Sequence, residues 1–240
     1  MQKIPGLVLK MIKIQRRKIV TLALNILKIL GATLLPYLLG SVSFPILVAR
    51  LFGTKDIREH GSGNAGGTNV LRVVGKRAAA MALLLDILKC VAAIAFVKYI
   101  LFNGAQYSGI AQCAAGLFCM LGHMFPVFFK FKGGKGVACA GGFMLIYNFW
   151  AAMILLTIFL AVSAISRYVS LGSIIAAAAM APAVYFMTGG NLLEAILAGL
   201  LGLAIIFMHR GNIVRLAKGQ ERKFGAKKES NSEEPEIKKG

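Results

Sequence analysis

Long apolar runs alternate with short polar segments along most of this chain. A helix needs about 20 apolar residues to cross a bilayer. Runs of that length occupy residues 28 to 52, 78 to 101, 108 to 129, 168 to 187 and 191 to 208. A further run, residues 137 to 166, is long for one crossing and short for two. The pattern predicts an all-α polytopic membrane protein whose number of spans depends on this last run.

The positions of lysine and arginine favour two crossings in residues 137 to 166. If this run folds back near Asn148, every basic loop from Arg50 onward and the basic C-terminal tail lie on one side of the membrane. The other side then keeps residues 102 to 107, the bend and residues 187 to 194, which contain no lysine or arginine. Basic loops are typically cytoplasmic. We therefore predict seven transmembrane helices, the fourth and fifth short, with the N-terminus outside and the C-terminus cytoplasmic.

The composition of the chain agrees with a membrane protein. Of the 240 residues, 58% are hydrophobic, yet the formal net charge is +19. A soluble domain of this length would not be so apolar, so the charge must be concentrated in loops and tails, where it attracts anionic headgroups or anionic substrates. Nucleic acid is a common partner of so basic a chain. Most residues here are predicted to lie in lipid, however, and we therefore expect no nucleic-acid partner.

The two ends of the chain depart from this scheme. Residues 1 to 27 form a basic extension, whose charges conflict with the outside location that an odd number of spans requires. This extension could be an interfacial helix, an additional hairpin element, or a segment absent from the physiological product, for which Met11 offers a later start. The transmembrane domain is predicted at residues 28 to 219. The interleaved lysines and glutamates of residues 220 to 240 predict a disordered cytoplasmic tail.

The cysteines and histidines do not form a recognisable metal motif. The four cysteines lie within or at the edge of apolar stretches and have no CxxC spacing, which predicts small core residues rather than metal ligands or disulfides. The three histidines are dispersed along the chain. We predict neither a metal site nor a cofactor.

A glycine-rich polar loop follows the first apolar run and ends at an arginine. Glycine permits positive φ angles, so successive N–H groups could converge on a phosphate, and Arg72 could add a bidentate contact. A flexible turn between spans is the simpler alternative, but a turn does not need the polar side chains that lie among the glycines. The candidate phosphate-binding residues of this loop are Gly61, Ser62, Gly63, Asn64, Gly66, Thr68, Asn69 and Arg72.

A second basic loop, residues 123 to 137, combines aromatic residues with a Lys-Gly-Gly-Lys-Gly turn that opens the next helix. Glycine-framed N–H groups at a helix N-terminus, flanked by ammonium groups, suit a second anion. The spacing differs from that of a P-loop. A positive-inside anchor is the alternative, and it explains the lysines but not the glycines. The candidate residues here are Lys132, Gly133, Gly134, Lys135 and Gly136.

Polar residues also occur where later spans meet the basic side, in residues 167 to 173 and 209 to 213. His209 could act as a general base or orient a substrate hydroxyl, although a histidine at the end of a span is also a common interface residue. Asp86 and Lys89 lie one helical turn apart within the second span. We favour a structural ion pair for them, because they lie away from the other motifs in the sequence.

Taken in chain order, these motifs resemble the bacterial acyl-phosphate-dependent glycerol-3-phosphate acyltransferases of the PlsY type. The resemblance runs from about Leu38 to Glu221. It comprises Gly40-Ser41, the GSGNxGxTNxxR loop, the Asp86 and Lys89 pair, the GHxFPxFxxFKGGKGVA loop, RYxSLGS and HRxNIxRL, with Gly219 and Glu221 beyond them. Such proteins transfer a fatty acyl group from acyl phosphate to the 1-hydroxyl of glycerol 3-phosphate, which yields lysophosphatidic acid and phosphate in the first acylation step of phospholipid synthesis.

The resemblance also implies roles for individual residues. Two phosphate-bearing substrates need two anion sites, and the chain offers two glycine-rich basic loops, although which loop holds which phosphate stays open. By position, the first loop would hold one phosphate, the second would form the other site, and residues of the last two motifs would complete the pocket. The catalytic residues implied in this way are Ser62, Arg72, Lys132, Ser170, His209 and Asn212.

Acyl phosphate is already activated, so the protein needs only to align the hydroxyl with the acyl carbonyl and to stabilise the developing charge. The hypothesis is direct transfer without an acyl-enzyme, with a substrate phosphate or His209 as the base. The resemblance further implies the bacterial cytoplasmic membrane, a site that faces the cytoplasm, and transient contact with the enzyme that supplies acyl phosphate. An organic-phosphate transporter or anion channel is the alternative function, but it would need its polar residues near mid-membrane.

Overall fold

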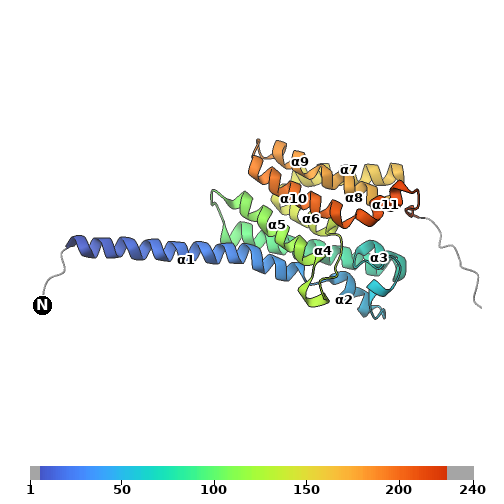
Figure 1. The fold of residues 1–240 in the computed structure, drawn as a ribbon, viewed down its shortest axis with the longest axis horizontal. Helices are drawn as coiled ribbons and strands as arrows, with labels where there is room; N and C mark the ends of the chain where they lie inside the picture. The colour runs from blue at the N-terminus through green and yellow to red at the C-terminus, as the bar shows by residue number, and fades with distance from the viewer. Residues whose placement is uncertain (1–5, 226–240) are drawn as a thin grey trace, which may run out of the picture.

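The computed structural model describes residues 6 to 225, and in this range all of the regular secondary structure is helical (Figure 1). The helices are α1 (Gly6–Gly40), α2 (Phe44–Leu51), α3 (Gly67–Val73), α4 (Lys76–Phe96), α5 (Ser108–Met124), α6 (Val137–Tyr147), α7 (Phe149–Ser166), α8 (Val169–Ala178), α9 (Met180–Met187), α10 (Leu192–Met208) and α11 (Arg210–Ala217). A π-helical turn, Val97–Leu101, extends α4, and 3-10 turns occupy Ile57–Glu59 and Val127–Phe129. The predicted all-α class is confirmed.

Several helical segments are long and apolar enough to cross a bilayer. Within residues 6 to 225 these are Lys10–Leu51, Lys76–Leu101, Ser108–Phe129 and Phe149–Ser166, which makes four. The count rises to six if the bent pairs α8 with α9 (43°) and α10 with α11 (59°) each make one crossing. α6 has 11 residues and is shorter than these segments.

The run from residue 137 to 166 breaks at Asn148, as predicted. The backbone of Asn148 is extended, with φ −152° and ψ 106°, so it ends α6, and its side-chain oxygen accepts a hydrogen bond from the Ala151 N–H at 2.9 Å, which caps α7. The prediction that both helices are short is wrong for α7. Its 18 residues extend about 27 Å at a rise of 1.5 Å per residue, because its apolar sequence continues without interruption to Ser166.

The first apolar run is not one continuous helix. α1 ends at Gly40 and α2 begins at Phe44. α1 approaches α5 so closely that a Cβ atom on Gly40 would collide with the carbonyl of Cys119, and one on Gly122 would collide with that of Tyr37. The Lys89 ammonium donates hydrogen bonds to the carbonyls of Gly40 (2.9 Å) and Val42 (2.7 Å). A buried cation therefore satisfies carbonyls that the break would otherwise leave unpaired.

The predicted pair of Asp86 and Lys89 is confirmed, with 2.7 Å between Oδ1 and Nζ. It does not lie apart from the other motifs, however. Lys89 contacts Gly40 of the first span, and its Nζ lies 3.1 Å from Nδ1 of His123, at the start of the second basic loop. The separation in sequence is misleading because α1, α4 and α5 pack side by side at this depth.

The four cysteines are buried and free, as predicted for core residues. Most of the buried apolar side chains form one cluster among α4, α5, α6 and α10, and a second, smaller cluster lies between α2, α3 and the first turns of α4. The second cluster supports the first glycine-rich loop.

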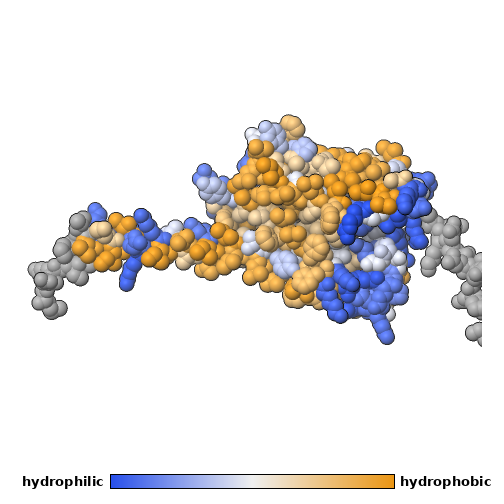
Figure 2. All heavy atoms as spheres, in the orientation of Figure 1, coloured by the Kyte–Doolittle hydropathy of each residue, from blue (hydrophilic) through white to orange (hydrophobic). Residues whose placement is uncertain are grey.

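Polar and apolar surfaces are separated along the bundle. Figure 2 shows hydrophilic residues gathered at the end where α2, α3 and α11 lie, and hydrophobic residues around its sides. The two glycine-rich loops reach this polar end, since the first precedes α3 and Arg58 beside it contacts the second. The candidate site therefore lies at this polar end of the bundle.

The N-terminal extension is part of α1 rather than a separate element. Residues 6 to 27 continue without a break into the segment that packs against α5, and Figure 1 shows this half of α1 projecting beyond the bundle, away from the polar end. Residues 1 to 5 of the predicted extension and 226 to 240 of the predicted tail lie outside the described residues.

Candidate active site

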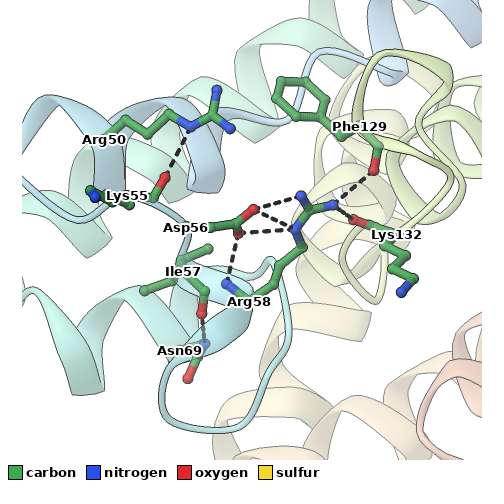
Figure 3. A network of polar contacts seen from close by, with 8 residues as sticks. All are labelled: Arg50, Lys55, Asp56, Ile57, Arg58, Asn69, Phe129 and Lys132. Carbon is green, nitrogen blue, oxygen red and sulfur yellow. Dashed lines mark hydrogen bonds and ion pairs between the residues drawn. The ribbon is translucent and has the colours of Figure 1, made fainter.

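Arg58 fastens the two glycine-rich loops together (Figure 3). Its Nη1 donates hydrogen bonds to the carbonyls of Phe129 (2.7 Å) and Lys132 (3.1 Å) in the second loop. Its Nη2 pairs with Asp56 Oδ2 at 2.6 Å. The Arg58 hydrogen bond lowers the pKa of Asp56 to about 2, so the pair is charged at neutral pH. Neither residue is among the predicted site residues, because nothing in their sequence context reveals a partner more than 70 positions away.

Asn69 organises the first loop from within. Its side chain is buried; Oδ1 accepts a hydrogen bond from the Ser62 N–H at 2.8 Å, and Nδ2 donates to the carbonyls of Ile57 (3.0 Å) and His60 (2.9 Å). Gly61 has φ +65°, and a Cβ atom there would collide with the Asn69 side chain. Asn69 therefore shapes the loop and its amide is already occupied, in contrast to its predicted role as a phosphate donor.

Other candidate groups of the first loop remain open to a ligand. The N-terminus of α3 has no side-chain cap at Gly66, and Thr68 is exposed beside it. Asn64 is half-buried next to Gly66. Gly63, in contrast, is not open: it takes a positive φ of +71°, and its N–H already donates to the His60 carbonyl at 3.1 Å. The N-terminus of α3, rather than the Asn69 amide, is therefore the part of this loop that stays available to an anion.

The paired glycines of the second loop serve close packing. The N–H groups of Gly133 and Gly134 donate to the carbonyls of Met124 and His123, each at 3.1 Å, so they are not free to cradle a phosphate as predicted. A Cβ atom on Gly134 would lie 2.7 Å from the Ala65 carbonyl and would collide with His123. These glycines allow the second loop to lie directly on the first. Gly136, with φ +84°, begins α6 without a side-chain cap.

Glu221 brings two of the predicted residues, Ser170 and Asn212, to one carboxylate. Its Oε1 accepts hydrogen bonds from Ser170 Oγ (2.9 Å) and Asn212 Nδ2 (2.7 Å), and its Oε2 accepts one from Arg215 Nε (2.8 Å). Lys135 donates to Asn212 Oδ1. Burial opposes ionisation, but hydrogen bonds from Asn212, Arg215 and Ser170 outweigh it and lower the pKa of Glu221. The second loop thus meets α8 and α11 through Lys135.

Glu221 and Arg215 are the functional candidates that sequence reasoning missed. Glu221 falls in the segment predicted to be a disordered tail, but residues 220 to 225 contact the helical domain, and the Phe224 N–H donates to the Arg167 carbonyl at 2.7 Å. The boundary of the folded part therefore lies beyond residue 219. The position of Glu221 at the end of the resembling segment is the one sequence signal that could have identified it.

Arg72 and Lys135 give this cluster an excess of positive charge. Burial lowers the pKa of Arg72, and the charges of Arg222 and Arg215 lower it further. Burial likewise lowers the pKa of Lys135 to about 8; Glu221 counteracts this effect, and Arg215 and Arg72 reinforce it. The guanidinium groups and the ammonium group repel one another across a partly desolvated space. An anion bound there would relieve that repulsion.

His209 is held in one tautomer. It is buried at the junction of α10 and α11, and its Nδ1 lies 2.8 Å from the carbonyl of Ile205. A carbonyl can only accept, so Nδ1 carries the proton and, in the neutral ring, Nε2 is left as a hydrogen-bond acceptor. Lys135 and Glu221 are both close enough to act electrostatically on this ring.

Of the predicted catalytic residues, Arg72 and His209 lie within electrostatic range of the cluster, whereas Ser62 and Lys132 are not joined to it. Ser62 and Lys132 are exposed, and among the described residues no hydrogen bond or ion pair links either side chain to Lys135, Asn212 or Glu221. Lys132 contributes its carbonyl to Arg58, while Lys135, predicted as a binding residue, takes the central position.

A possible metal-ligand set lies deeper in the bundle. Asp86, His123 and Cys139 offer ligand atoms within 4.8 Å of one another, and all three are buried. The Lys89 ammonium lies among them, 2.7 Å from Asp86 Oδ1. A cation of this protein therefore already neutralises the carboxylate, which makes the set a poor fit for a metal ion.

Known proteins share both the sequence and the fold of this chain. The sequence model of the family described as "Glycerol-3-phosphate acyltransferase" matches residues 30–219. Proteins of that name are similar: the one from Dechloromonas aromatica is 42% identical over 197 residues, 81% of this chain and 95% of the relative, and one from Rhodopseudomonas palustris (strain HaA2) is 44% identical over 200 residues, 83% of this chain and 97% of the relative.

Two crystal structures of PlsY (YgiH), an integral membrane glycerol 3-phosphate acyltransferase, resemble this fold. The glycerol 3-phosphate form has a TM-score of 0.73 and 39% sequence identity, and the match covers 82% of this chain and 96% of that one. The lysophosphatidic acid form has a TM-score of 0.72 and 38% identity, with 82% and 95% covered. On this agreement of family, relatives and fold, the chain belongs to the glycerol-3-phosphate acyltransferase family.

Proposed function

We propose that the protein transfers a fatty acyl group from acyl phosphate to the 1-hydroxyl of glycerol 3-phosphate, releasing lysophosphatidic acid and phosphate. The names of the relatives and of the two PlsY structures include glycerol 3-phosphate, the acyl acceptor in this reaction, which supports the assignment. The donor, acyl phosphate, is the finer part of the proposal. It requires a second anion site beside the one for glycerol 3-phosphate.

The observation that carries the proposal is the convergence of basic residues from separate motifs at one end of the bundle. Arg72, Lys135 and Arg215 lie within electrostatic range of one another, with Arg72 in the last turn of α3 and Lys135 just before the uncapped N-terminus of α6. Two phosphate groups can be neutralised by such a set, with guanidinium forks and helix N-termini as their ligands. Ser170 and Asn212, both buried, donate to Glu221 and so hold its carboxylate beside this set.

The chemistry is a direct displacement at the acyl carbonyl carbon. The glycerol 1-hydroxyl oxygen forms the new ester bond, the bond from the carbonyl carbon to the phosphate oxygen breaks, and inorganic phosphate leaves. The hydroxyl proton passes to a substrate phosphate, or to Nε2 of His209. Positioning and charge stabilisation supply the catalysis, so no acyl-enzyme forms. Trapping a covalent acyl-protein that turns over at the catalytic rate would refute this step.

The proposed topology follows from the same charge distribution. Counting α6 and each bent pair as one crossing gives seven spans, with α1 and α2 together as the first. The basic end then faces the cytoplasm of a bacterial cell at its plasma membrane, with the C-terminus on the same side. A soluble enzyme that makes acyl phosphate would deliver it at that face by transient contact.

The decisive experiment uses purified protein with glycerol 3-phosphate and a long-chain acyl donor. We expect lysophosphatidic acid to form with acyl phosphate and at least tenfold less with acyl-CoA, a difference of about 1.4 kcal/mol in transition-state stabilisation. Product formation from acyl-CoA alone would refute the donor assignment. Absence of product from both donors would refute the activity.

An organic-phosphate transporter is the second candidate, and the break between α1 and α2 is the observation in its favour. Transporters place substrates at discontinuous helices near mid-membrane. Here the groups at the break, Asp86, Lys89 and His123, are buried and pair with one another. Phosphate flux into liposomes that contain the protein, together with failure of the acyl-transfer assay, would establish the transporter instead.

A further inference from the structure

The extension at residues 6 to 27 has no role in the reaction proposed above. The family match begins at residue 30, and Figure 1 shows this half of α1 standing beyond the bundle. Lys28, whose ammonium lies 5.7 Å from the centroid of the Phe102 ring, marks the level where α1 leaves the other helices. The 22 preceding residues extend about 33 Å further at the rise of an α-helix.

The apolar residues of this extension follow a heptad repeat. Starting at Val8, apolar residues recur at alternating intervals of four and three up to Ile29, with Gln15 as the one polar member. The first heptad position is isoleucine each time. In coiled-coil notation the a positions are Ile12, Ile19 and Ile26, and the d positions are Val8, Gln15, Leu22 and Ile29. Three sustained heptads are typical of a helix that pairs with another helix.

This seam is exposed. Ile19, Leu22 and Ile29 are 58%, 62% and 59% exposed, although an a or d side chain in a coiled coil is buried. Five polar residues occupy the outer positions b, c and f of the helix: Lys10, Lys13, Arg17, Thr21 and Lys28. Three more, Arg16, Lys18 and Asn25, flank the seam at the e and g positions.

Charge at the flanking positions permits pairing with an identical helix. In a parallel pair, each g residue faces the e residue five positions later on its partner. Met11 would face Arg16, and Lys18 would face Ala23. The basic residues of the extension therefore never oppose one another across the seam. The charge that makes the extension unusual does not prevent self-association.

The membrane fixes the relative direction of two copies. Copies with the same transmembrane topology leave the bilayer from the same side and at the same level, so their extensions are parallel and in register. α1 also lies along one edge of the bundle, where it packs against α5, α4 and the π-helical turn (Figure 1). Two bundles can therefore approach through this edge. Isoleucine at a favours two strands when leucine is at d, and here leucine occupies the central d position, Leu22, beside the isoleucines at a.

We infer that the extension of α1 is a self-association helix, which forms a parallel coiled coil with a second copy of this chain through the seam from Val8 to Ile29. The occupant of the exposed apolar face is thus the same face of the partner. The site at the polar end of the bundle does not take part, so the inference stands or falls independently of the proposed acyl transfer.

Cysteine cross-linking of the full-length protein in lipid bilayers tests the seam directly. The four native cysteines are buried, so any disulfide between two copies will come from the single cysteine introduced on the extension. We expect Leu22→Cys, at a d position, to form a disulfide-linked dimer readily on oxidation. Leu24→Cys, at the outer f position of the same turn, is the matched control and should form several-fold less. Equal cross-linking at both positions, or none at Leu22→Cys, would overturn the proposal.

Paired substitutions measure the energetic contribution of the seam. Ile19→Asn with Ile26→Asn removes two a residues, whereas Val20→Asn with Leu27→Asn makes the same kind of change at two b positions. The seam pair should raise the dimer dissociation constant by more than about tenfold, because even one buried isoleucine contributes that much. The b-position pair should change it by less than about threefold. Equal effects would contradict the register.

The competing occupant is a lipid surface. Vesicles with and without anionic phospholipid distinguish the two, with trypsin added on the side of the extension and the oligomeric state measured in parallel. A monomer at every protein-to-lipid ratio, with the extension protected from trypsin only by anionic lipid, would show that the membrane covers the seam and would refute self-association. A dimer in both kinds of vesicle supports the proposal.

Discussion

The Lys135 ammonium donates a hydrogen bond to the amide oxygen of Asn212, 77 positions later in the chain. This contact joins the basic loop before α6 to the first turns of α11, and Asn212 in turn donates to Glu221. The contact identifies Lys135, rather than Lys132, as the ammonium group at the centre of the site.

Replacing each lysine separately tests that distinction. Lys135→Met should lower kcat/KM for glycerol 3-phosphate by about tenfold to a hundredfold, because a hydrogen bond from a charged donor is worth about 1.5 to 3 kcal/mol. Lys132→Met, the matched control, should stay within about threefold of wild type. Steady-state kinetics in detergent or nanodiscs provide the measurement. The opposite ranking would restore Lys132 to the site.

The pH dependence of the reaction should reflect the deprotonation of the Lys135 ammonium. In the proposed site this ammonium binds the substrate anion, and burial lowers its pKa to about 8, so kcat/KM should fall as the pH rises through that value. The carboxylate of Glu221 raises this pKa. Glu221→Gln should therefore move the alkaline limb to lower pH. A limb that stays in place in Glu221→Gln, or persists in Lys135→Met, would assign it to another group.

Arg72 should require its guanidinium as well as its charge. Arg72→Lys preserves the charge but loses the planar fork that contacts two phosphate oxygens, so activity should fall by about tenfold or more, which corresponds to about 1.4 kcal/mol. Kinetics with both substrates varied would locate the defect in one of the two anion sites. Wild-type kinetics in this variant would contradict the bidentate contact.

The main effect of replacing Asn69 should be a loss of protein stability rather than a direct loss of substrate contacts. Asn69→Ala removes the acceptor of the Ser62 N–H and the donor to two carbonyls, so the free energy of unfolding should fall by about 1 to 3 kcal/mol. Thr68→Ala, at the exposed neighbour, should change stability by less than about 0.5 kcal/mol. Thermal unfolding of both variants decides the matter. A stable but inactive Asn69→Ala protein would instead support direct contact with a ligand.

The buried ion pair should be sensitive to the loss of one partner. Lys89→Met leaves Asp86 charged and two carbonyls without a donor, so stability should fall by about 3 to 5 kcal/mol. Combining Lys89→Met with Asp86→Asn should recover part of that loss, since the unpaired charge is gone. Unfolding in detergent measures both. If the double variant is no more stable than Lys89→Met, the pair does not explain the effect.

Much of the chemical character of the site is visible in the sequence, but its connections are not. The glycine-rich loops, Ser170, His209 and Asn212 are conspicuous because polar residues stand out in an apolar chain. Composition cannot tell which N–H groups the protein uses internally, so Gly133, Gly134 and Asn69 are predicted as ligands although they bond within the structure. Glu221 is overlooked because a charged tail and a folded segment have the same composition.

The fold, like the site, has some features that the sequence predicts and others that it does not. Hydrophobic periodicity and the distribution of charge predict the helices and the break at Asn148. They do not predict the interruption at Gly40, because its cause is the approach of α5, nor the continuity of α1 through its basic extension. Long-range packing bears on the first feature but not on the second, because the extension projects beyond the bundle.

Arg58 links the two glycine-rich loops, each of which we propose to serve one substrate, so that they cannot move independently. Thermodynamic linkage then imposes a symmetry on binding. If glycerol 3-phosphate at one loop changes the affinity of the other loop for acyl phosphate, then acyl phosphate must change the affinity for glycerol 3-phosphate by the same factor. Cooperativity between the substrates would therefore depend on the Arg58 contacts between the loops. A change in these contacts could alter the cooperativity without altering the affinity of either loop for its own substrate.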